Sequence, residues 1–287
     1  MRLSSVRSCC DIEHTFRAVL SELFNHGTRS APRGMAIIEL INCTIIVSDP
    51  THCLLIHPSR QTSKKYVAAE ILWYLSGSKS VDEIGQYAEM WKKVADDDGN
   101  VNSNYGDLIF NPHILRSSES LSQFEWCRRT LEYDIDSRQA VLNLNLLEHK
   151  VRETKDFPCT LSLQFIVREN KLHMITNMRS NDFIFGFMND FPFFSFVQQT
   201  MHSALLHCYP TLELGKYIHN AASLHIYERH YKLMGDVVAS SNTGVGGTSE
   251  GFDKINAHDV LLFLLKGEQR GIIQQLHDWK YGKELSI

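Results

Sequence analysis

The residues best suited to chemistry gather in the central stretch, residues 157–194. Cys159 opens a run of alternating apolar residues, and a second such run ends at Arg179 and Ser180. The polar dipeptide at 169–170 separates the two runs and predicts a hairpin turn. A two-residue turn would pair Cys159 with Ser180, and directly opposed side chains have Cβ atoms about 4.5–5.5 Å apart.

This pairing would place a thiol beside a guanidinium, which is the setting of an activated cysteine nucleophile. Arg179 and Ser180 are also good ligands for a phosphate group. The same pattern fits a core hairpin with a buried Cys159 and a salt-bridged arginine, because free cysteine is often a core residue. Pattern alone leaves both interpretations open.

Three carboxylates stand in apolar surroundings. Glu70 lies in the middle of the segment KKYVAAEILWYLSG, which is apolar almost all round and predicts a buried helix. Asp182 and Asp190 lie in a segment dense in phenylalanine. A buried carboxylate needs a partner, a proton or a cavity, so each is a candidate functional group. The alternative for Glu70 is a partly exposed edge of the helix.

Helical periodicity and capping signals predict the elements that position these groups. We expect helices over 11–26, from a Ser63 cap to Leu75, over 80–94 from a capping box at Ser80 and Glu83, over 119–133 and over 193–208. We expect strands within 35–47, 140–146 and 224–227, and loops at 28–34 and 240–251. Mixed strands and helices without regular βαβ alternation predict an α+β fold, and the lack of a linker predicts one domain over 1–287.

Composition narrows the function classes. The chain has 287 residues, 43% of them hydrophobic and 22% charged, with a net charge of −4, so no basic field argues for nucleic acid. The apolar runs are too short for a membrane span, and the N-terminus lacks a secretory signal. Seven irregularly spaced cysteines indicate reduced thiols in a cytoplasm. The histidines show no metal-binding pattern.

Several motifs in one order resemble the thymidylate synthase superfamily, nearest to its pyrimidine hydroxymethylase branch, which includes enzymes of certain phages. The resemblance covers about residues 27–230. The motifs are AEILWYLSG around Glu70, NSNYG at 102–106, DSR at 136–138, PCT at 158–160, NMRSNDFIFGFMND at 177–190 and SLHIY at 223–227. It implies a three-layer fold whose mixed sheet forms a homodimer interface.

The resemblance implies that the Cys159 thiolate adds to C6 of a pyrimidine nucleotide. C5 then becomes nucleophilic and takes a one-carbon unit from 5,10-methylenetetrahydrofolate, the cosubstrate; without saturation of C6, C5 is too weak a nucleophile. Glu70 matches the glutamate that organises water and proton transfers, and its apolar setting suits acid/base work. Asn104 and Tyr105 match positions near the substrate.

Other matches imply the binding residues. Phosphate would be held by Arg33, Arg179 and Ser180, together with Arg138 from the neighbouring subunit. The synthases carry a second arginine after the cross-subunit one, and here that position is Gln139, which removes a charge. His225 and Tyr227 match contacts to the sugar hydroxyl. The matched folate contacts are Asp182, Trp91, Val94 and Gly186.

Asp190 is the discriminating position, since the synthases hold an asparagine there that reads uracil. An ionised carboxylate only accepts hydrogen bonds, so it suits the N4 amino group of cytosine and also N3–H if N3 is protonated. This implies a deoxycytidylate 5-hydroxymethylase of nucleotide biosynthesis, in a host cytoplasm if phage-encoded. Val94 and Thr160 resemble the hydroxymethylases, in which water traps the exocyclic methylene without oxidation of tetrahydrofolate.

Three alternatives stay open on the sequence. The substrate could be cytidylate, in a nucleoside natural-product pathway, because Ser180 favours deoxyribose only weakly. It could be deoxyuridylate, with a methyl or hydroxymethyl product. The chain could also be a non-catalytic nucleotide-binding protein on the same fold, which would predict decayed catalytic positions, whereas Cys159, Glu70 and Asp182 are intact.

Overall fold

The computed structural model describes residues 5–9, 11–114, 120–151, 153–240 and 246–282. The chain divides into two compact units, each assembled from three segments. The first unit comprises residues 1–62, 173–195 and 215–252, and the second comprises residues 63–172, 196–214 and 253–287. Each unit combines helices with strands, so the α+β class predicted from the sequence is confirmed.

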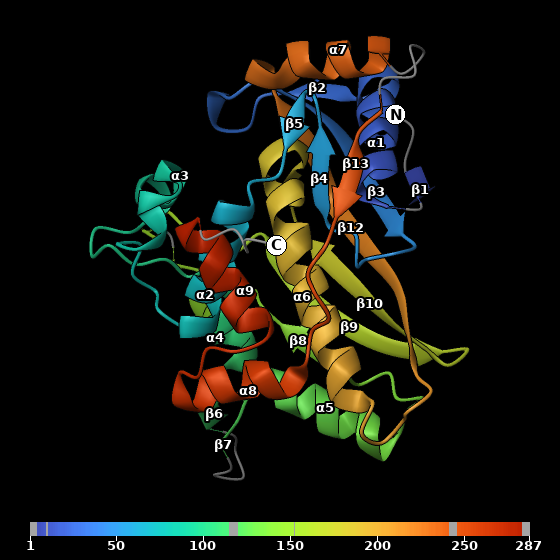
Figure 1. Ribbon diagram of the computed structural model, residues 1–287. Helices are drawn as coiled ribbons and strands as arrows, with labels where there is room; N and C mark the ends of the chain where they lie inside the picture. The colour runs from blue at the N-terminus through green and yellow to red at the C-terminus, as the bar shows by residue number, and fades with distance from the viewer. Residues whose placement is uncertain (1–4, 10, 115–119, 152, 241–245, 283–287) are drawn as a thin grey trace. The chain divides into compact units, whose positions relative to one another are not determined.

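The first unit is built on a mixed sheet. Its centre is β3 (Ile37–Val47), which runs parallel to β1 (Ser5–Cys9) and antiparallel to both β12 (Glu213–Tyr227) and β2 (Thr28–Ser30). On the far side of β12 lies β10 (Lys171–Met178) (Figure 1). The short β11 (Asn181–Asp182) also pairs with β12, in the parallel direction. Polar residues on β11 and at the end of β12 are thereby brought together at one end of the sheet.

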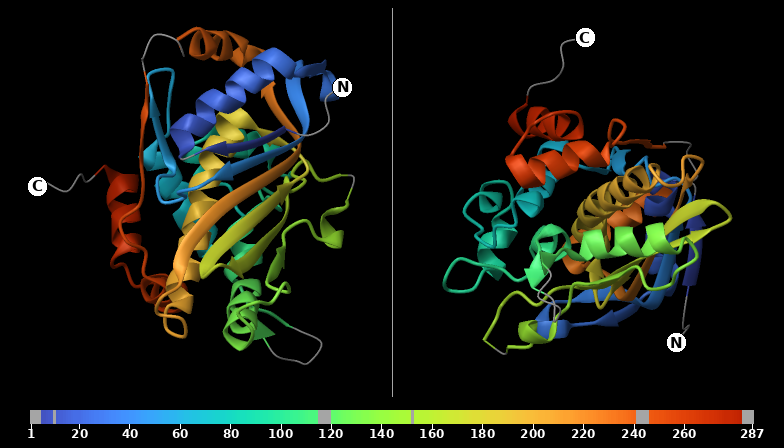
Figure 2. Two further views of the ribbon diagram at one scale, coloured as in Figure 1. Left: turned by 90° about the vertical axis from the view of Figure 1, so that its right-hand side faces the viewer. Right: turned by 90° about the horizontal axis from the view of Figure 1, so that it is seen from below.

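Two helices and a small second sheet complete this unit. Asp11 caps α1 (Ile12–His26), whose buried stripe includes Phe16 and Leu20, and α7 (Tyr231–Ser240) packs beside it (Figure 2). The small sheet orders β13 (Thr248–Glu250), β4 (Leu54–His57) and β5 (Arg60–Gln61). A 3₁₀ turn, η1 (Pro32–Gly34), follows β2 and carries Arg33.

The second unit is organised by the predicted apolar helix, α2 (Lys64–Ser76). Ser63 accepts a hydrogen bond from the Tyr66 amide as its N-cap, and Gly77 ends it in the left-handed conformation at φ 67°. Around α2 lie α9 (Ile272–Tyr281) and α4 (Tyr105–Phe110). The unit also contains α5 (Gln123–Tyr133), α8 (Ala257–Lys266), the antiparallel pair β8 (Val141–Asn143) and β9 (Thr160–Arg168), and the pair β6 (His113–Ile114) and β7 (Ser120–Leu121).

The hairpin turn predicted at 169–170 is confirmed. Glu169 and Asn170 both have positive φ, at 53° and 57°, as a two-residue type I′ turn requires. The predicted pairing of Cys159 with Ser180 stays a prediction.

The single helix predicted over 80–94 is wrong. The segment holds a 3₁₀ turn, η2 (Ile84–Gln86), and the short α3 (Glu89–Val94), separated by the extended Ala88 at φ −149°. Tertiary bonds override the capping-box signal, because Ser80 pairs with Asn100 and its carbonyl accepts from Trp73 Nε1 at 2.9 Å. Glu83 forms an ion pair with Lys280 of α9 instead of capping a helix.

Other boundaries moved. The predicted helix over 119–133 begins at residue 123, behind a Ser122 cap, and the predicted residue 119 lies outside the described residues. The helix predicted at 193 begins at 188 as α6 (Met188–Leu205), with Pro192 inside it. The loop predicted at 28–34 contains β2, and the loop predicted at 240–251 contains β13, while its residues 241–245 lie outside the described part. Among the described helices, none has the length and apolar character needed to cross a membrane.

Candidate active site

Cys159 is half-buried and directly precedes β9 in the second unit. Both of its neighbours are held through the main chain. Asn145 Nδ2 donates to the Pro158 carbonyl at 3.1 Å, and the Thr160 amide donates to the Tyr105 hydroxyl at 3.2 Å. These two bonds fix the backbone that carries the thiol.

A buried polar cluster anchors the segment that leads to Cys159. Asp156 is 8% exposed, and one of its carboxyl oxygens accepts from both the amide and the hydroxyl of Ser103 at 2.7 Å. Asn102 Nδ2 donates to the Asp156 carbonyl at 2.9 Å and to the Thr154 hydroxyl at 2.9 Å. Burial raises the pKa of Asp156, and the Ser103 hydrogen bonds lower it. Asn102 and Ser103 of the NSNYG segment therefore fix the position of Thr154 and Asp156, which precede Cys159 in the chain.

All the hydrogen bonds described for the Asn104 side chain are structural. It is 1% exposed, its Oδ1 caps α4 by accepting from the Asp107 amide, and its Nδ2 donates to the carbonyls of Trp73 and Ser78. Tyr105 is likewise buried, with its hydroxyl at the Thr160 amide. Their predicted contacts with substrate stay predictions.

Glu70 is 3% exposed, so it does not lie at a partly exposed edge of α2. The Tyr66 hydroxyl donates to Glu70 Oε1 at 2.6 Å, and Trp91 Nε1 of α3 donates to that hydroxyl at 3.0 Å. Val94, one helical turn after Trp91, is half-buried. The second unit therefore holds a buried carboxylate with a hydrogen-bonded tyrosine at its side.

In the first unit, β11 and β12 bring together four of the predicted ligand contacts. Asp182 pairs with His225 across the two parallel strands, and the Ser180 hydroxyl lies 3.5 Å from His225 Nδ1. The ring of Tyr227 meets the ring of His225 edge-on at 5.1 Å. This arrangement offers adjacent hydroxyl, imidazole and carboxyl groups to one ligand.

Asp182 caps the turn that follows it, because its Oδ1 accepts from the Ile184 amide at 3.1 Å. Burial raises the pKa of Asp182, while the Ile184 amide and the nearby His225 and His230 lower it. For the buried His225, burial lowers the pKa and Asp182 raises it. The pair places a hydrogen-bond acceptor next to an imidazole.

Asp190, in the first turn of α6, is held by Asn181 Nδ2, which donates to its Oδ2 at 2.8 Å. The pKa of Asp190 is raised to about 7, chiefly by burial and also by the nearby Asp182, while the hydrogen bond from Asn181 lowers it. Gly186 leaves the room for Asn181, since a Cβ at residue 186 would lie 3.0 Å from Asn181 Nδ2. Around neutral pH, Asp190 therefore exchanges between its acid and its ionised form.

Arg60 lies beside these groups although no sequence motif pointed to it. Its Nε donates to the Ile184 carbonyl at 3.3 Å, one of its terminal nitrogens donates to Asn189 Oδ1 at 3.2 Å, and its guanidinium lies 5.1 Å from the centre of the Phe185 ring. Burial lowers the pKa of Arg60 and Asp182 raises it. The residue also lines a cavity of about 450 Å³ beside β5. No local pattern signals this role, because its partners lie more than 120 residues along the chain.

The predicted phosphate ligands are distributed over both units. Arg33 is exposed in η1 and has a left-handed backbone at φ 54°. Its loop is tied to the end of β12, because the amide after Tyr227 donates to the Ala36 carbonyl at 3.0 Å. Arg179 is half-buried beside Ser180, and Arg138 of the second unit is exposed. Arg33, Ser180 and Tyr227 thus lie around one end of the first unit's sheet.

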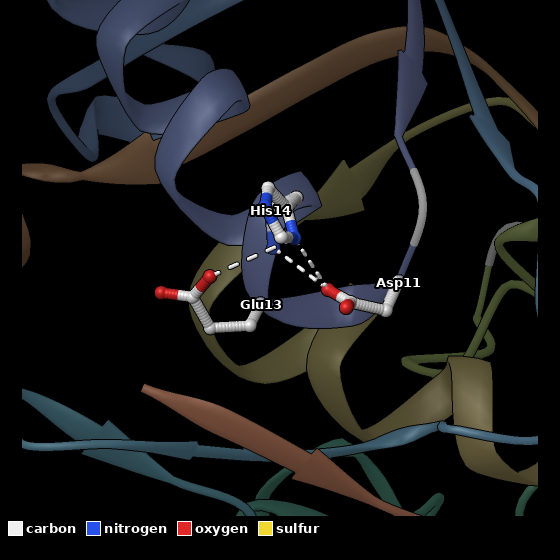
Figure 3. Close-up of side chains that lie close together, drawn as sticks. All are labelled: Asp11, Glu13 and His14. Carbon is white, nitrogen blue, oxygen red and sulfur yellow. Dashed lines mark hydrogen bonds and ion pairs between the residues drawn. The ribbon is translucent and has the colours of Figure 1, made fainter. Parts of the chain in front are cut away.

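One further cluster lies at the start of α1 (Figure 3). Asp11 Oδ1 accepts from the His14 amide and lies 3.0 Å from His14 Nδ1, while Glu13 binds Arg17 at 3.2 Å and the Gly247 amide at 3.0 Å. Helix capping and an ion pair account for this cluster, and it assigns no metal site.

The fold matches a solved structure, the thermostable thymidylate synthase A from Bacillus subtilis. The TM-score is 0.63 over 79% of this chain and 84% of that one, at 19% sequence identity. This likeness defines the class of fold.

The family follows from sequence comparison. The thymidylate synthase family model matches residues 14–244, and the chain belongs to that family. Among curated relatives, the deoxycytidylate 5-hydroxymethyltransferase of Enterobacteria phage T6 is 31% identical over 70% of this chain and 80% of its own length. The deoxyuridylate hydroxymethyltransferase of Bacillus phage SP01 is 29% identical over 74% of this chain and 56% of its own length.

Proposed function

We propose that this protein is a deoxycytidylate 5-hydroxymethyltransferase. The observation that carries the proposal is the placement of the half-buried Asp190, whose Oδ2 accepts a hydrogen bond from Asn181 Nδ2 at 2.8 Å. Burial raises the pKa of this carboxyl to about 7. The family supports a folate-dependent one-carbon transfer to a pyrimidine nucleotide, and the phage relatives support deoxycytidylate.

Asp190 can complement cytosine in either protonation state. The neutral acid accepts from the N4 amino group and donates to N3, whereas the ionised form accepts from N4–H and from a protonated N3. Because its pKa lies near neutrality, the proton can move to N3 at little cost as the ring becomes more basic during reaction. An ionised carboxylate repels O4 of uracil, so the site favours cytosine.

The chemistry begins at Cys159. Its thiolate adds to C6, and the electron pair of the C5–C6 bond makes C5 nucleophilic toward the one-carbon unit. The C5 proton is then lost, the leaving amine departs, and water adds to the exocyclic carbon as the thiolate is expelled. The products are 5-hydroxymethyldeoxycytidylate and tetrahydrofolate, with no change in the oxidation level of the carbon. Glu70 would organise the water and the proton transfers.

The residues matched to the folate fit it. Asp182 offers a carboxyl acceptor to pterin N–H groups, and Gly186 keeps the adjoining turn free of a side chain. Trp91 and Val94 supply apolar surface on α3. Methylenetetrahydrofolate supplies the carbon at the oxidation level of formaldehyde; the chain's own residues bind and orient it.

We further propose a homodimer in which Arg138 of the partner subunit joins Arg33, Arg179 and Ser180 around the phosphate. The exposure of Arg138 is compatible with this reach. Because Gln139 is neutral, fewer positive charges would bind the phosphate than in the synthases. The enzyme would work on small metabolites in the cytoplasm.

A second candidate substrate is deoxyuridylate. A neutral Asp190 presents one donor and one acceptor, and this pair can also fit O4 and N3–H of uracil. The phage deoxyuridylate relative belongs to the same family.

The test is turnover of deoxycytidylate, cytidylate, deoxyuridylate and uridylate with methylenetetrahydrofolate, with product masses measured. We expect hydroxymethyldeoxycytidylate to dominate. Preference for a uracil nucleotide refutes the proposed role of Asp190, and a methyl product refutes the trapping by water. Inactivity with all four favours the non-catalytic alternative.

A further inference from the structure

Tyr66 and Glu70 lie on the same face of α2, one turn apart. Side chains four residues apart on a helix are neighbours, and here the Tyr66 hydroxyl donates to Glu70 Oε1 at 2.6 Å. A hydroxyl bound to a carboxylate at this separation is a short, charge-assisted hydrogen bond. Glu70 is 3% exposed, so such a donor offsets part of the cost of burying its charge.

A second donor fixes the direction of this bond. Trp91 Nε1 lies 3.0 Å from the Tyr66 hydroxyl oxygen, and an indole N–H can only donate. The hydroxyl therefore accepts from Trp91 and turns its single proton toward Glu70. The result is a directed chain of hydrogen bonds, from indole to phenol to carboxylate, in which each bond polarises the next.

The donor at the start of this chain is held by packing. Trp91 is 5% exposed, and its ring lies 4.8 Å from the ring of Trp73 at an angle of 58°. Trp73 is in turn tied to the Ser80 carbonyl at 2.9 Å. Tyr66 lines a cavity of about 350 Å³, which Tyr87 also lines.

We propose that Tyr66 is a positioning residue for Glu70, which it holds in one orientation through the chain from Trp91. The inference rests on the proposed function, in which Glu70 organises water and proton transfers. Tyr66 need not touch the nucleotide, so its loss lowers kcat and leaves the KM for the nucleotide unchanged. A hydroxyl that serves only the packing of α2 would alter thermal stability without this split.

The test is a double-mutant cycle on the full-length protein, read as tritium release from C5-labelled deoxycytidylate with methylenetetrahydrofolate. The variants are Tyr66→Phe, Glu70→Gln and their combination. We expect Tyr66→Phe to lower kcat about tenfold to a hundredfold, the worth of a hydrogen bond to a charged group. In the Glu70→Gln background, the same change should alter kcat less than about twofold.

Tyr87→Phe is the matched control, because it removes a hydroxyl from a tyrosine that lines the same cavity. It should retain the wild-type kcat, and thermal unfolding should show all variants folded. An undiminished kcat in Tyr66→Phe, or equal losses in both backgrounds, overturns the positioning role alone. An undiminished kcat in Glu70→Gln overturns the proposed role of Glu70 and the inference with it.

Discussion

Replacing Asp190 with asparagine tests how the base is read. Asn181 Nδ2 donates to one carboxyl oxygen of Asp190 at 2.8 Å, so the carbonyl oxygen of the new amide takes that place. The NH₂ group must then occupy the position of the other oxygen. On the proposed function, the atom that meets the N4 amino group of cytosine changes from an acceptor to a donor.

The expected loss follows from these contacts. One charge-assisted hydrogen bond disappears and two donors are set against each other, which costs about 3 kcal/mol, or roughly a 150-fold loss in kcat/KM for deoxycytidylate. The same amide donates to O4, so turnover of deoxyuridylate should rise. The assay is kcat/KM on both nucleotides, measured for the variant and the wild type.

Asp182→Asn is the matched control. It makes the same chemical change at a carboxyl assigned to the folate, so we expect a raised KM for methylenetetrahydrofolate. Because Asp182 also raises the pKa of Asp190, the preference for the base should change, but far less than in Asp190→Asn. If Asp190→Asn keeps the wild-type preference for deoxycytidylate over deoxyuridylate, the reasoning about this carboxyl is refuted.

The same variant has a signature in stability. The pKa of Asp190 rises from 3.8 to about 7 on folding, so between these pH values the native state holds a proton that the unfolded chain has released. The free energy of unfolding therefore falls as pH rises through that window, because the buried carboxyl must ionise in the folded state. Above the folded pKa, the buried ionised carboxylate destabilises the native state by up to about 4 kcal/mol. Asp190→Asn removes it, so urea unfolding should find the variant more stable than wild type at about pH 8 and similar at about pH 4. A difference that is constant with pH would contradict this account.

Three further perturbations have defined outcomes. Cys159→Ala should abolish tritium release from C5-labelled deoxycytidylate while binding of the nucleotide by calorimetry persists; release at the wild-type rate would remove the thiol from the mechanism. Asp156→Ala leaves the Ser103 amide and hydroxyl unpaired, so we expect a loss of about 1–3 kcal/mol in urea unfolding and a lower kcat; unchanged values would show that the cluster does not hold the nucleophile segment. Gly186→Ala presses a methyl group against Asn181, so it should weaken the preference for deoxycytidylate; an unaltered ratio of kcat/KM values would show that the turn yields.

Local signals predicted local structure well. Ser63 and Gly77 bound α2 because a cap and a left-handed terminus act within one turn, and the turn at 169–170 depends on two residues alone. The helix expected from Ser80 failed because that residue's bonds reach Trp73 and Asn100. A local capping signal therefore fails to predict a helix where the same residues form hydrogen bonds with distant parts of the chain.

The candidate site shows the same difference between local signals and long-range contacts. Motifs pointed to Asp182, Asp190 and His225, which the structure gathers within the first unit. The bond between Asn181 and Asp190 and the shifted pKa of that carboxyl depend on burial, which sequence letters do not encode. Arg60 was missed because its partners come from a turn more than 120 residues away.

The main-chain bonds on either side of Cys159 have a practical consequence. The groups that hold this position are the Pro158 carbonyl and the Thr160 amide, which any side chain at residue 159 would keep. A substitution such as Cys159→Ala should therefore give an inactive variant that still binds the nucleotide and the folate. Such a protein would allow the order of ligand binding to be determined under equilibrium conditions.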